Sequence, residues 1–161
     1  MRFFYYASFS KHIAGETSPT LASIMETFIT RLHPGADLKE SLDQWAKENN
    51  VAAAMIVSGI GSLSIAAIRY ADQPAATMID GPLEIISLQG IVSHHGSHIH
   101  MSVADARGIV RGGHLKEGSI IRTTAEIGLI ITEKWTLERV QDAETGYVEL
   151  RPAHVSPLNE T

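Results

Sequence analysis

The 161-residue sequence contains no cysteine, which excludes disulfides, thiolate zinc sites and cysteine nucleophiles. A chain of this length should bury about 70% of the surface that its unfolded form exposes, so it needs no disulfide or structural metal to fold. Charge is also scarce, because charged residues make up 19% of the sequence against roughly 25% in most soluble domains. We therefore expect part of the surface to be buried by self-association.

Long apolar runs are absent too, since none reaches the roughly 20 residues that a membrane span requires. The aromatic patch near the N-terminus is interrupted by Ser, Lys and His before it attains the apolar length of a signal peptide. These absences predict a cytoplasmic protein without membrane contact. The 13 Lys and Arg are outnumbered by 18 Asp and Glu, and a net charge of −5 has the wrong sign for general attraction to nucleic acid. Any DNA contact would be local and weak.

The sequence predicts one domain with two appended ends. Residues 1–22 lack clear periodicity and are interpreted as an N-terminal extension, with Met25 as an alternative natural start. Residues 23–152 form the single predicted domain, and residues 153–161 an unanchored C-terminal tail.

Within the domain we expect one clear helix and a series of strands. Asp37 is the predicted N-cap of an amphipathic helix that ends near residues 49–50. Strands are predicted over residues 25–32, on both sides of a bend at Gly59 and Gly61, over 83–93 with a bulge at Gly90, over 97–103 pairing with 109–111, and over 120–132, 133–140 and the end of 142–150. No helix-length segment separates these strands, which favours an α+β fold with a largely antiparallel sheet and one or two flanking helices.

Histidines are concentrated in one short region, with five of the eight between residues 94 and 114. On a strand, His98 and His100 project to the same face about 7 Å apart. The hairpin that follows returns beside this strand, and Gly112-Gly113 allows His114 to approach the same point. Three neutral imidazoles with an open position form a catalytic-type site for zinc or a similar divalent metal. The alternative is that these are surface or hydrogen-bonded sheet histidines.

Several neighbouring residues are candidates for supporting roles. His94 and His95 are interpreted as loop residues, of which at most one could complete or gate a metal site. Ser102 shares the predicted face of His98 and could hydrogen-bond a ligand imidazole. Glu84 and Glu126 are candidate general bases, although carboxylates at such positions commonly face solvent or a neighbouring Arg.

An ordered set of short motifs resembles a known family. The motifs are RLHPGADL at 31–38, SGIGSL at 58–63, the His98/His100 strand with SVAD at 102–105, GGHL at 112–115, TAE at 124–126 and TGY at 145–147. Over roughly residues 25–150 this set resembles the PPC domain, conserved in plants and prokaryotes. The resemblance implies an α+β homotrimer and, in some prokaryotic members, a metal held by histidines that correspond to His98, His100 and His114.

The same resemblance raises a DNA-binding function, because the plant domain is fused to AT-hooks and described as DNA-binding. Arg151-Pro152 has no flanking basic residues and does not form an AT-hook. The remaining basic candidates for a DNA contact are Arg107, Arg111, Lys116 and Arg122.

Two main functions and one variant stay open from the sequence. The first is a homotrimeric regulatory or DNA-associated module with a His-ligated metal. The second is a zinc-dependent, hydrolase-like metalloenzyme of unknown substrate, with Glu126 or Glu84 as proton carrier. In the variant, the metal only clamps a subunit interface. The sequence does not decide whether the protein is an enzyme.

Overall fold

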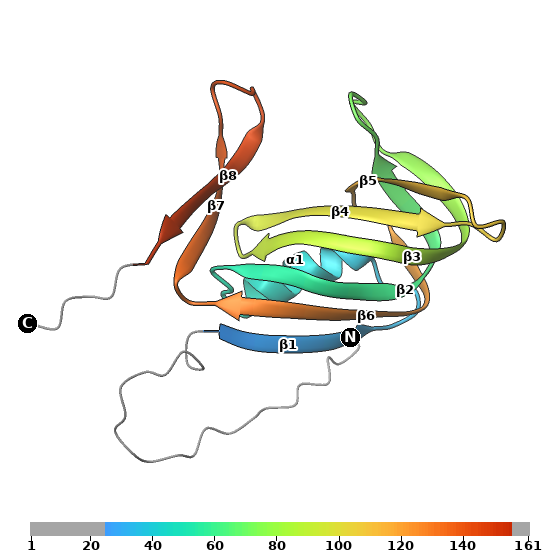
Figure 1. Cartoon of the computed structure of the whole chain (residues 1–161), viewed down its shortest axis with the longest axis horizontal. Coiled ribbons are helices and arrows are strands. Elements are labelled where there is room, and N and C mark those ends of the chain that lie inside the picture. Colours follow the sequence, from blue (N-terminus) through green and yellow to red (C-terminus); the bar gives the residue numbers. More distant parts are fainter. Residues whose placement is uncertain (1–24, 156–161) are drawn as a thin grey trace, which may run out of the picture.

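The computed structural model describes residues 25–155, and Figure 1 shows one helix behind a curved sheet with a separate hairpin at one end. The elements are β1 (Met25–Leu32), α1 (Leu38–Glu48), β2 (Ala54–Arg69), β3 (Thr77–Ser93), β4 (Gly96–Ala104), β5 (Val110–Leu115), β6 (Ile120–Thr132), β7 (Trp135–Gln141) and β8 (Val148–His154). The predicted extension at 1–22 and residues 156–161 of the predicted tail lie outside the described range. β8 continues to His154, past the predicted start of that tail at residue 153.

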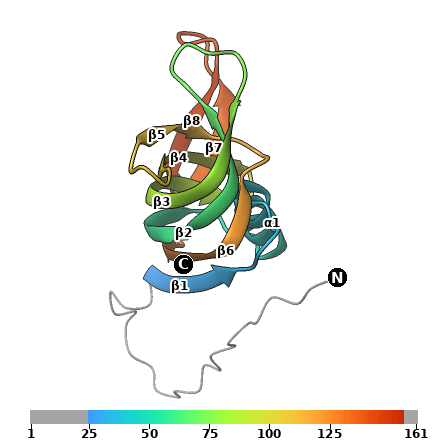
Figure 2. The ribbon, with the colours of Figure 1, turned by 90° about the vertical axis from the view of Figure 1, so that its right-hand side faces the viewer.

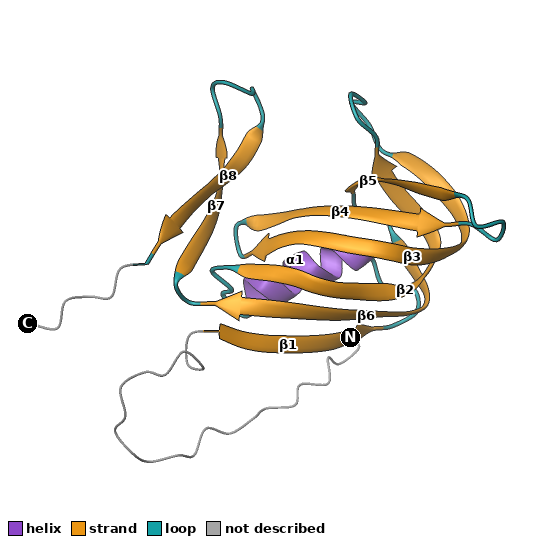
Figure 3. Cartoon of the chain, viewed as in Figure 1, coloured by secondary structure: helices purple, strands orange, loops and turns teal. Residues whose placement is uncertain are grey.

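Six strands form an antiparallel sheet in the order β1-β6-β2-β3-β4-β5, and β7 pairs with β8 as a second sheet (Figure 3). The sheet curls, because β5 pairs both with β4 and with the end of β2 (Figure 2). Residues 25–155 are thus mostly antiparallel strand with a single helix. This agrees with the predicted antiparallel sheet, although the helix content is small for an α+β fold.

The helix forms and docks as its sequence predicts. The Asp37 side chain accepts a hydrogen bond from the Glu40 backbone N–H at 3.0 Å, which caps the first turn. Residues recurring on one helical face are buried against the sheet: Leu38, Leu42, Trp45 and Ala46. The Trp45 ring stacks on Phe28 of β1 with centroids 4.6 Å apart, so the helix end is fixed to the sheet edge.

Two local predictions at glycines were wrong. β2 continues through Gly59 and Gly61 as one strand, where the sequence predicted two strands around a bend. Register shifts in its pairing with β6 absorb the irregularity without ending the strand. Gly90 is not a bulge either, since it pairs in register with Ile99, and the register shift between β3 and β4 lies between Ile85 and Ser87.

The sheet has one covered and one open face. Helix α1 covers one face, and alternation turns exposed apolar side chains such as Ile29 and Ile60 to the other, with exposed fractions of 82% and 55%. Met55, Ile91 and His98 lie opposite one another on β2, β3 and β4, so this histidine belongs to the open face. In the part of the chain described, no helix combines the length and apolarity that crossing a bilayer would take.

Candidate metal centre

Three histidines meet on the open face of the sheet. His98 and His100 project from β4, and His114 on β5 lies directly opposite His100. One ring nitrogen from each lies within 4.8 Å of the others, and Nε2 of His98 is 3.3 Å from Nε2 of His100. The structure therefore brings together the three residues singled out in the sequence; we call them the triad.

The strand backbones position the triad through alternation and close approach. Ile99 and Met101 are buried in the core, which turns the intervening His100 and its neighbour His98 to the opposite face. Gly113 precedes His114 at the point where β5 crosses to β2, and a Cβ there would lie 2.7 Å from the Arg69 carbonyl oxygen. Only a residue without a side chain fits this approach.

The environment of the triad favours neutral imidazoles. Burial, aided by the positive charge of His98, lowers the pKa of His114 to about 4. Burial, followed by the Arg139 guanidinium, also lowers the pKa of His98. Neutral imidazole is the form that ligates a metal, so both rings are ready to bind at neutral pH.

One atom of the triad has a hydrogen-bonding capacity that residues 25–155 leave unused. Nδ1 of His114 is buried and has no hydrogen-bond partner among them. A buried polar atom without a partner is unfavourable, and a bound cation would satisfy it. Three imidazole nitrogens are also a standard zinc ligand set. The residues present thus fit a divalent metal.

The other predicted residues around the triad have different partners. The ring of His94 hydrogen-bonds through Nδ1 to the Val51 carbonyl oxygen at 2.9 Å and packs against His95, with centroids 4.0 Å apart. Both therefore belong to the β3–β4 turn. Ser102 shares the face of the triad, but its Oγ bonds to Oγ of Ser87 at 2.7 Å.

The two candidate general bases lie away from the triad. Glu84 on β3 pairs with Ala104, at the opposite end of β4 from His98. Glu126 on β6 faces Arg31 on β1, and two strands separate β6 from β4. At about 4.8 Å per strand, this places Glu126 about 14 Å from the line of β4. The structure does not bring either carboxylate to the triad within one chain.

A cavity of about 840 Å³ opens beside the triad, between the loop joining β2 to β3 and the β7–β8 hairpin. The tips of these two hairpins rise on the same side of the sheet (Figure 1). His98 and His114 line the cavity together with Arg69, Lys116 and Arg139. We call it the triad cavity.

Of the cations in the triad cavity, sequence reasoning identified only Lys116. Arg69 was missed because its place depends on the short pairing of β2 with β5, where it lies opposite His114. Arg139 was missed because it comes from the β7–β8 hairpin. The remaining basic candidates lie elsewhere, with Arg107 and Arg111 exposed along the β4–β5 hairpin and Arg122 exposed on β6.

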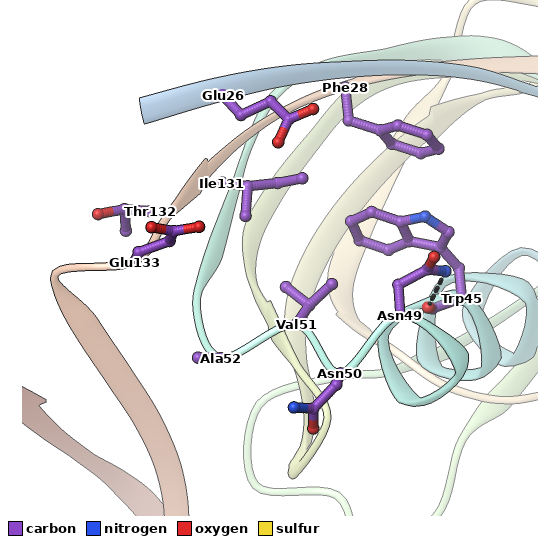
Figure 4. A pocket seen from close by; sticks show the side chains of 10 residues that line it. All are labelled: Glu26, Phe28, Trp45, Asn49, Asn50, Val51, Ala52, Ile131, Thr132 and Glu133. Atoms are coloured by element: carbon purple, nitrogen blue, oxygen red, sulfur yellow. Dashed lines mark hydrogen bonds between the residues drawn. The ribbon is translucent and has the colours of Figure 1, made fainter. Parts of the chain in front are cut away.

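A second cavity, of about 400 Å³, lies where the end of α1 meets β1 and β6 (Figure 4). Phe28 and Trp45 stack along one side, and Glu26 and Glu133 lie at its rim. The Asn49 side chain donates to the Trp45 carbonyl oxygen at 2.8 Å and closes the end of the helix. These contacts join the helix to the sheet, and no histidine lines this space.

The sequence of the chain matches a family model and is similar to curated proteins. The family model of the Plants and Prokaryotes Conserved (PCC) domain matches residues 20–133. The chain is 40% identical over 143 residues to the "Bifunctional protein GlmU" of Synechococcus sp. (strain JA-2-3B'a(2-13)), a match that covers 89% of this chain and 22% of that protein. The chain thus spans about a fifth of the length of this curated relative.

Solved structures share the fold of this chain, some of them at more than 30% sequence identity. A hypothetical protein from Salmonella cholerae-suis is 35% identical with a TM-score of 0.78, over 81% of this chain and 94% of that one. A metal-containing protein from Archaeoglobus fulgidus is 31% identical with a TM-score of 0.68, over 80% and 94% of the two chains. Two further structures are named as candidate DNA-binding proteins, but at 18% and 22% identity they show the fold alone.

Proposed function

We propose, from the premise that the chain belongs to the Plants and Prokaryotes Conserved domain family, that it is a self-associating metal-binding domain. The family resemblance predicted from the sequence is confirmed. In this proposal His98, His100 and His114 hold zinc or a similar divalent ion. The observation that carries it is the set of three ring nitrogens within 4.8 Å of one another.

The surroundings of the triad support this role. His114 Nδ1 is buried without a partner among residues 25–155, and the lowered pKa values of His98 and His114 keep both rings neutral. A relative 31% identical to the chain is itself a metal-containing protein. A divalent ion held by the three imidazoles would supply Lewis-acid chemistry at this site. His98 and His114 line the triad cavity, so their rings are reached from that side.

The open face of the sheet supports self-association. Its apolar side chains, including Ile29 at 82% exposed and Val57 at 64%, have no cover within residues 25–155. Burying such a surface against other copies of the chain is favourable by about 25 cal/mol per Å² of apolar area. We take the homotrimer that the family resemblance implies as the assembly. Since the triad shares this face, subunit contacts would lie near the metal.

A zinc-dependent, hydrolase-like enzyme is the second candidate function, and the triad cavity is the observation that favours it. Its volume of about 840 Å³ lies within the range of roughly 300–1,000 Å³ of small-molecule sites. Glu149, which lines this cavity, replaces Glu84 and Glu126 as the proton carrier that the geometry favours. The chain also matches about a fifth of the longer "Bifunctional protein GlmU". This match favours a domain that acts as one module of a larger protein, beside other activities.

The test is metal content by elemental analysis of protein purified without a His-tag, reloaded with zinc and dialysed. We expect stoichiometric zinc in the wild type and in His33→Ala, a histidine outside the triad. The variants His98→Ala and His114→Ala should lose the metal while far-UV circular dichroism stays almost unchanged, because a core of this size does not need the ion to fold. Stoichiometric metal in the triple Ala variant of the triad would refute the assignment.

A further inference from the structure

The triad cavity collects positive charge in a chain whose net charge is −5. We propose that this cavity binds an oxyanion, the phosphate or carboxylate group of a small molecule, between Arg69, Lys116 and Arg139. The inference deepens the proposed function and rests on it, because His98 and His114 form one wall of the same cavity. The metal ligands alone do not indicate what the triad cavity binds, and the proposal names the chemical class of its ligand.

The cations come from three different elements and converge on the triad. Arg69 lies opposite His114 in the β2–β5 pairing, so both side chains project to one face. Lys116 lies two residues beyond His114 and lines the cavity from the end of β5. Nη1 of Arg139 is 3.4 Å from Nδ1 of His98, while its Nη2 donates to the Val148 carbonyl oxygen. The contact with Val148 holds the Arg139 guanidinium at the wall of the cavity.

The three cavity cations form no ion pair with any carboxylate that the structure describes. Within residues 25–155, the ion pairs join Lys39 to Asp43 and Glu117, and Arg151 to Glu138. All three cavity cations are partly buried, and a partly buried charge without a counterion is unfavourable. An oxyanion would supply charge-assisted hydrogen bonds to the two guanidinium groups.

The charges that line the cavity still favour an anion after its carboxylates are included. Asp72 and Glu149 also line it, so three cations stand against two carboxylates, a net charge of +1. A divalent ion on the triad would raise this to +3. A small anion therefore finds a favourable potential here, although the protein as a whole repels it.

The contact between Arg139 and His98 couples the anion to the metal. Nε2 of His98 faces His100, so it is the nitrogen placed to serve as a ligand. In the loaded state Nδ1 of His98 then carries the ring proton and cannot accept a hydrogen bond from Arg139. The released guanidinium N–H is free for the anion, so metal loading should strengthen anion binding.

The wall that carries Arg139 lies past the residues that the family model matches. Arg139 and Glu149 lie in the β7–β8 hairpin, past the residues 20–133 that the family model matches. The cavity is also lined from the β2–β3 loop, from β4 and β5, and from the β7–β8 hairpin, and it has the volume of a small-molecule site. We therefore assign the anion to a small molecule.

The experiment titrates zinc-loaded protein, dialysed free of unbound zinc, with inorganic phosphate and with acetate by isothermal titration calorimetry. Arg139→Gln and Arg69→Gln keep a polar side chain and remove the charge, and Arg107→Gln on the exposed β4–β5 turn is the matched control. We expect saturable binding of at least one anion, weakened about tenfold in each cavity variant and unchanged in the control. Zinc content should be the same in all four proteins.

The outcomes separate the anion from the metal. Zinc-loaded protein that binds neither anion up to about 10 mM overturns the anion site and leaves the metal site standing. Equal affinity in Arg139→Gln and the wild type also overturns it. If the wild type holds no zinc, the proposed function fails, and the titration of metal-free protein then decides alone: binding lost in Arg139→Gln supports the anion site, and no binding overturns it. Tighter phosphate assigns a phosphate group, and tighter acetate a carboxylate.

Discussion

His114 lies directly opposite Arg69, across the short pairing between β5 and the end of β2. On its other side, His114 lies opposite His100 of β4. One position on β5 thus sets both the third metal ligand and its distance from a cavity cation. Because a one-residue slip of a strand turns its side chains to the other face, the register of β5 controls both features together.

Gly90 should be indispensable for the geometry of the triad. It pairs with Ile99, between His98 and His100, at a φ of +155°, and a Cβ there would lie 2.1 Å from the His98 carbonyl oxygen. Gly90→Ala should lower the free energy of unfolding by roughly 1–3 kcal/mol or more, since strained backbone adds to the clash. Chemical denaturation measures the loss, and zinc analysis the effect on the site.

The control for this substitution is Gly128→Ala on β6, where the added Cβ would meet only Ser58 Cβ at an ordinary 3.9 Å. Its unfolding should stay close to that of the wild type. A Gly90→Ala protein as stable as Gly128→Ala, and with full zinc content, would show that β3 can move away from β4 without cost.

The β4–β5 turn gives a prediction for acid pH. Backbone N–H groups of Ile109 and then Arg107 donate to the Asp105 carboxylate, and they lower its pKa from the ordinary 3.8. The unfolded state then binds the proton more tightly, so the carboxylate stabilises the fold above pH 3.8 and loses this effect as the pH falls through the lowered pKa. Asp105→Ala should therefore unfold at a lower temperature than the wild type at neutral pH.

This difference in thermal midpoint should shrink as the pH falls below 3.8 and through the lowered pKa of Asp105, because the wild-type carboxylate then becomes protonated. Circular dichroism on metal-free protein measures both midpoints without interference from metal release. A difference that stays constant from neutral pH to the acid range would mean that the turn does not depend on the charge of Asp105.

The proposed homotrimer gives a prediction for the mass of the protein in solution. Light scattering at micromolar concentration should give three times 17.5 kDa, about 52 kDa. Ile60 is 55% exposed, so Ile60→Asp should leave the single chain folded but lower the mass, because it buries a charge in the subunit contact. Gln44→Asp, on the exposed side of α1, adds the same charge elsewhere and should keep the mass. A wild-type mass near that of one chain would contradict the trimer.

DNA binding should be weak or absent for this chain. The net charge of −5 opposes the phosphate field, and three of its basic side chains are directed to the triad cavity. A gel shift at about 150 mM salt should show no complex at sub-micromolar protein, whatever the sequence of the duplex. A complex at sub-micromolar protein under these conditions would contradict this prediction and would favour DNA binding as the function of the protein.

Local signals carried the sequence predictions that the structure reproduces. Alternation defines β1 at Met25–Leu32, and the Asp37 cap begins α1, because both depend on neighbouring residues alone. His98 and His100 were found by the same period of two. The approach of His114 also followed from sequence, since the turn and Gly112-Gly113 return the chain within a few residues.

Contacts between distant segments could not be read in this way. The uninterrupted course of β2 depends on pairing with β3 and β6, which tolerates its glycines through register shifts. Arg69 and Arg139 reach the triad only because the sheet closes on β5 and because a separate hairpin folds back beside it. Nothing in the spacing of these residues along the chain indicates such closure.

The β7–β8 hairpin forms a sheet of its own, and Leu137 anchors it to the larger one. The Leu137 backbone N–H donates to the Ala52 carbonyl oxygen at 3.1 Å, and its carbonyl oxygen accepts from Ser93 Oγ at 2.7 Å. The histidines thus lie on strands of the six-stranded sheet, whereas Arg139 and Glu149 lie in the separate β7–β8 sheet. Because the two sheets are separate, substitutions in the hairpin can alter which molecule is recognised while the metal ligands stay as they are.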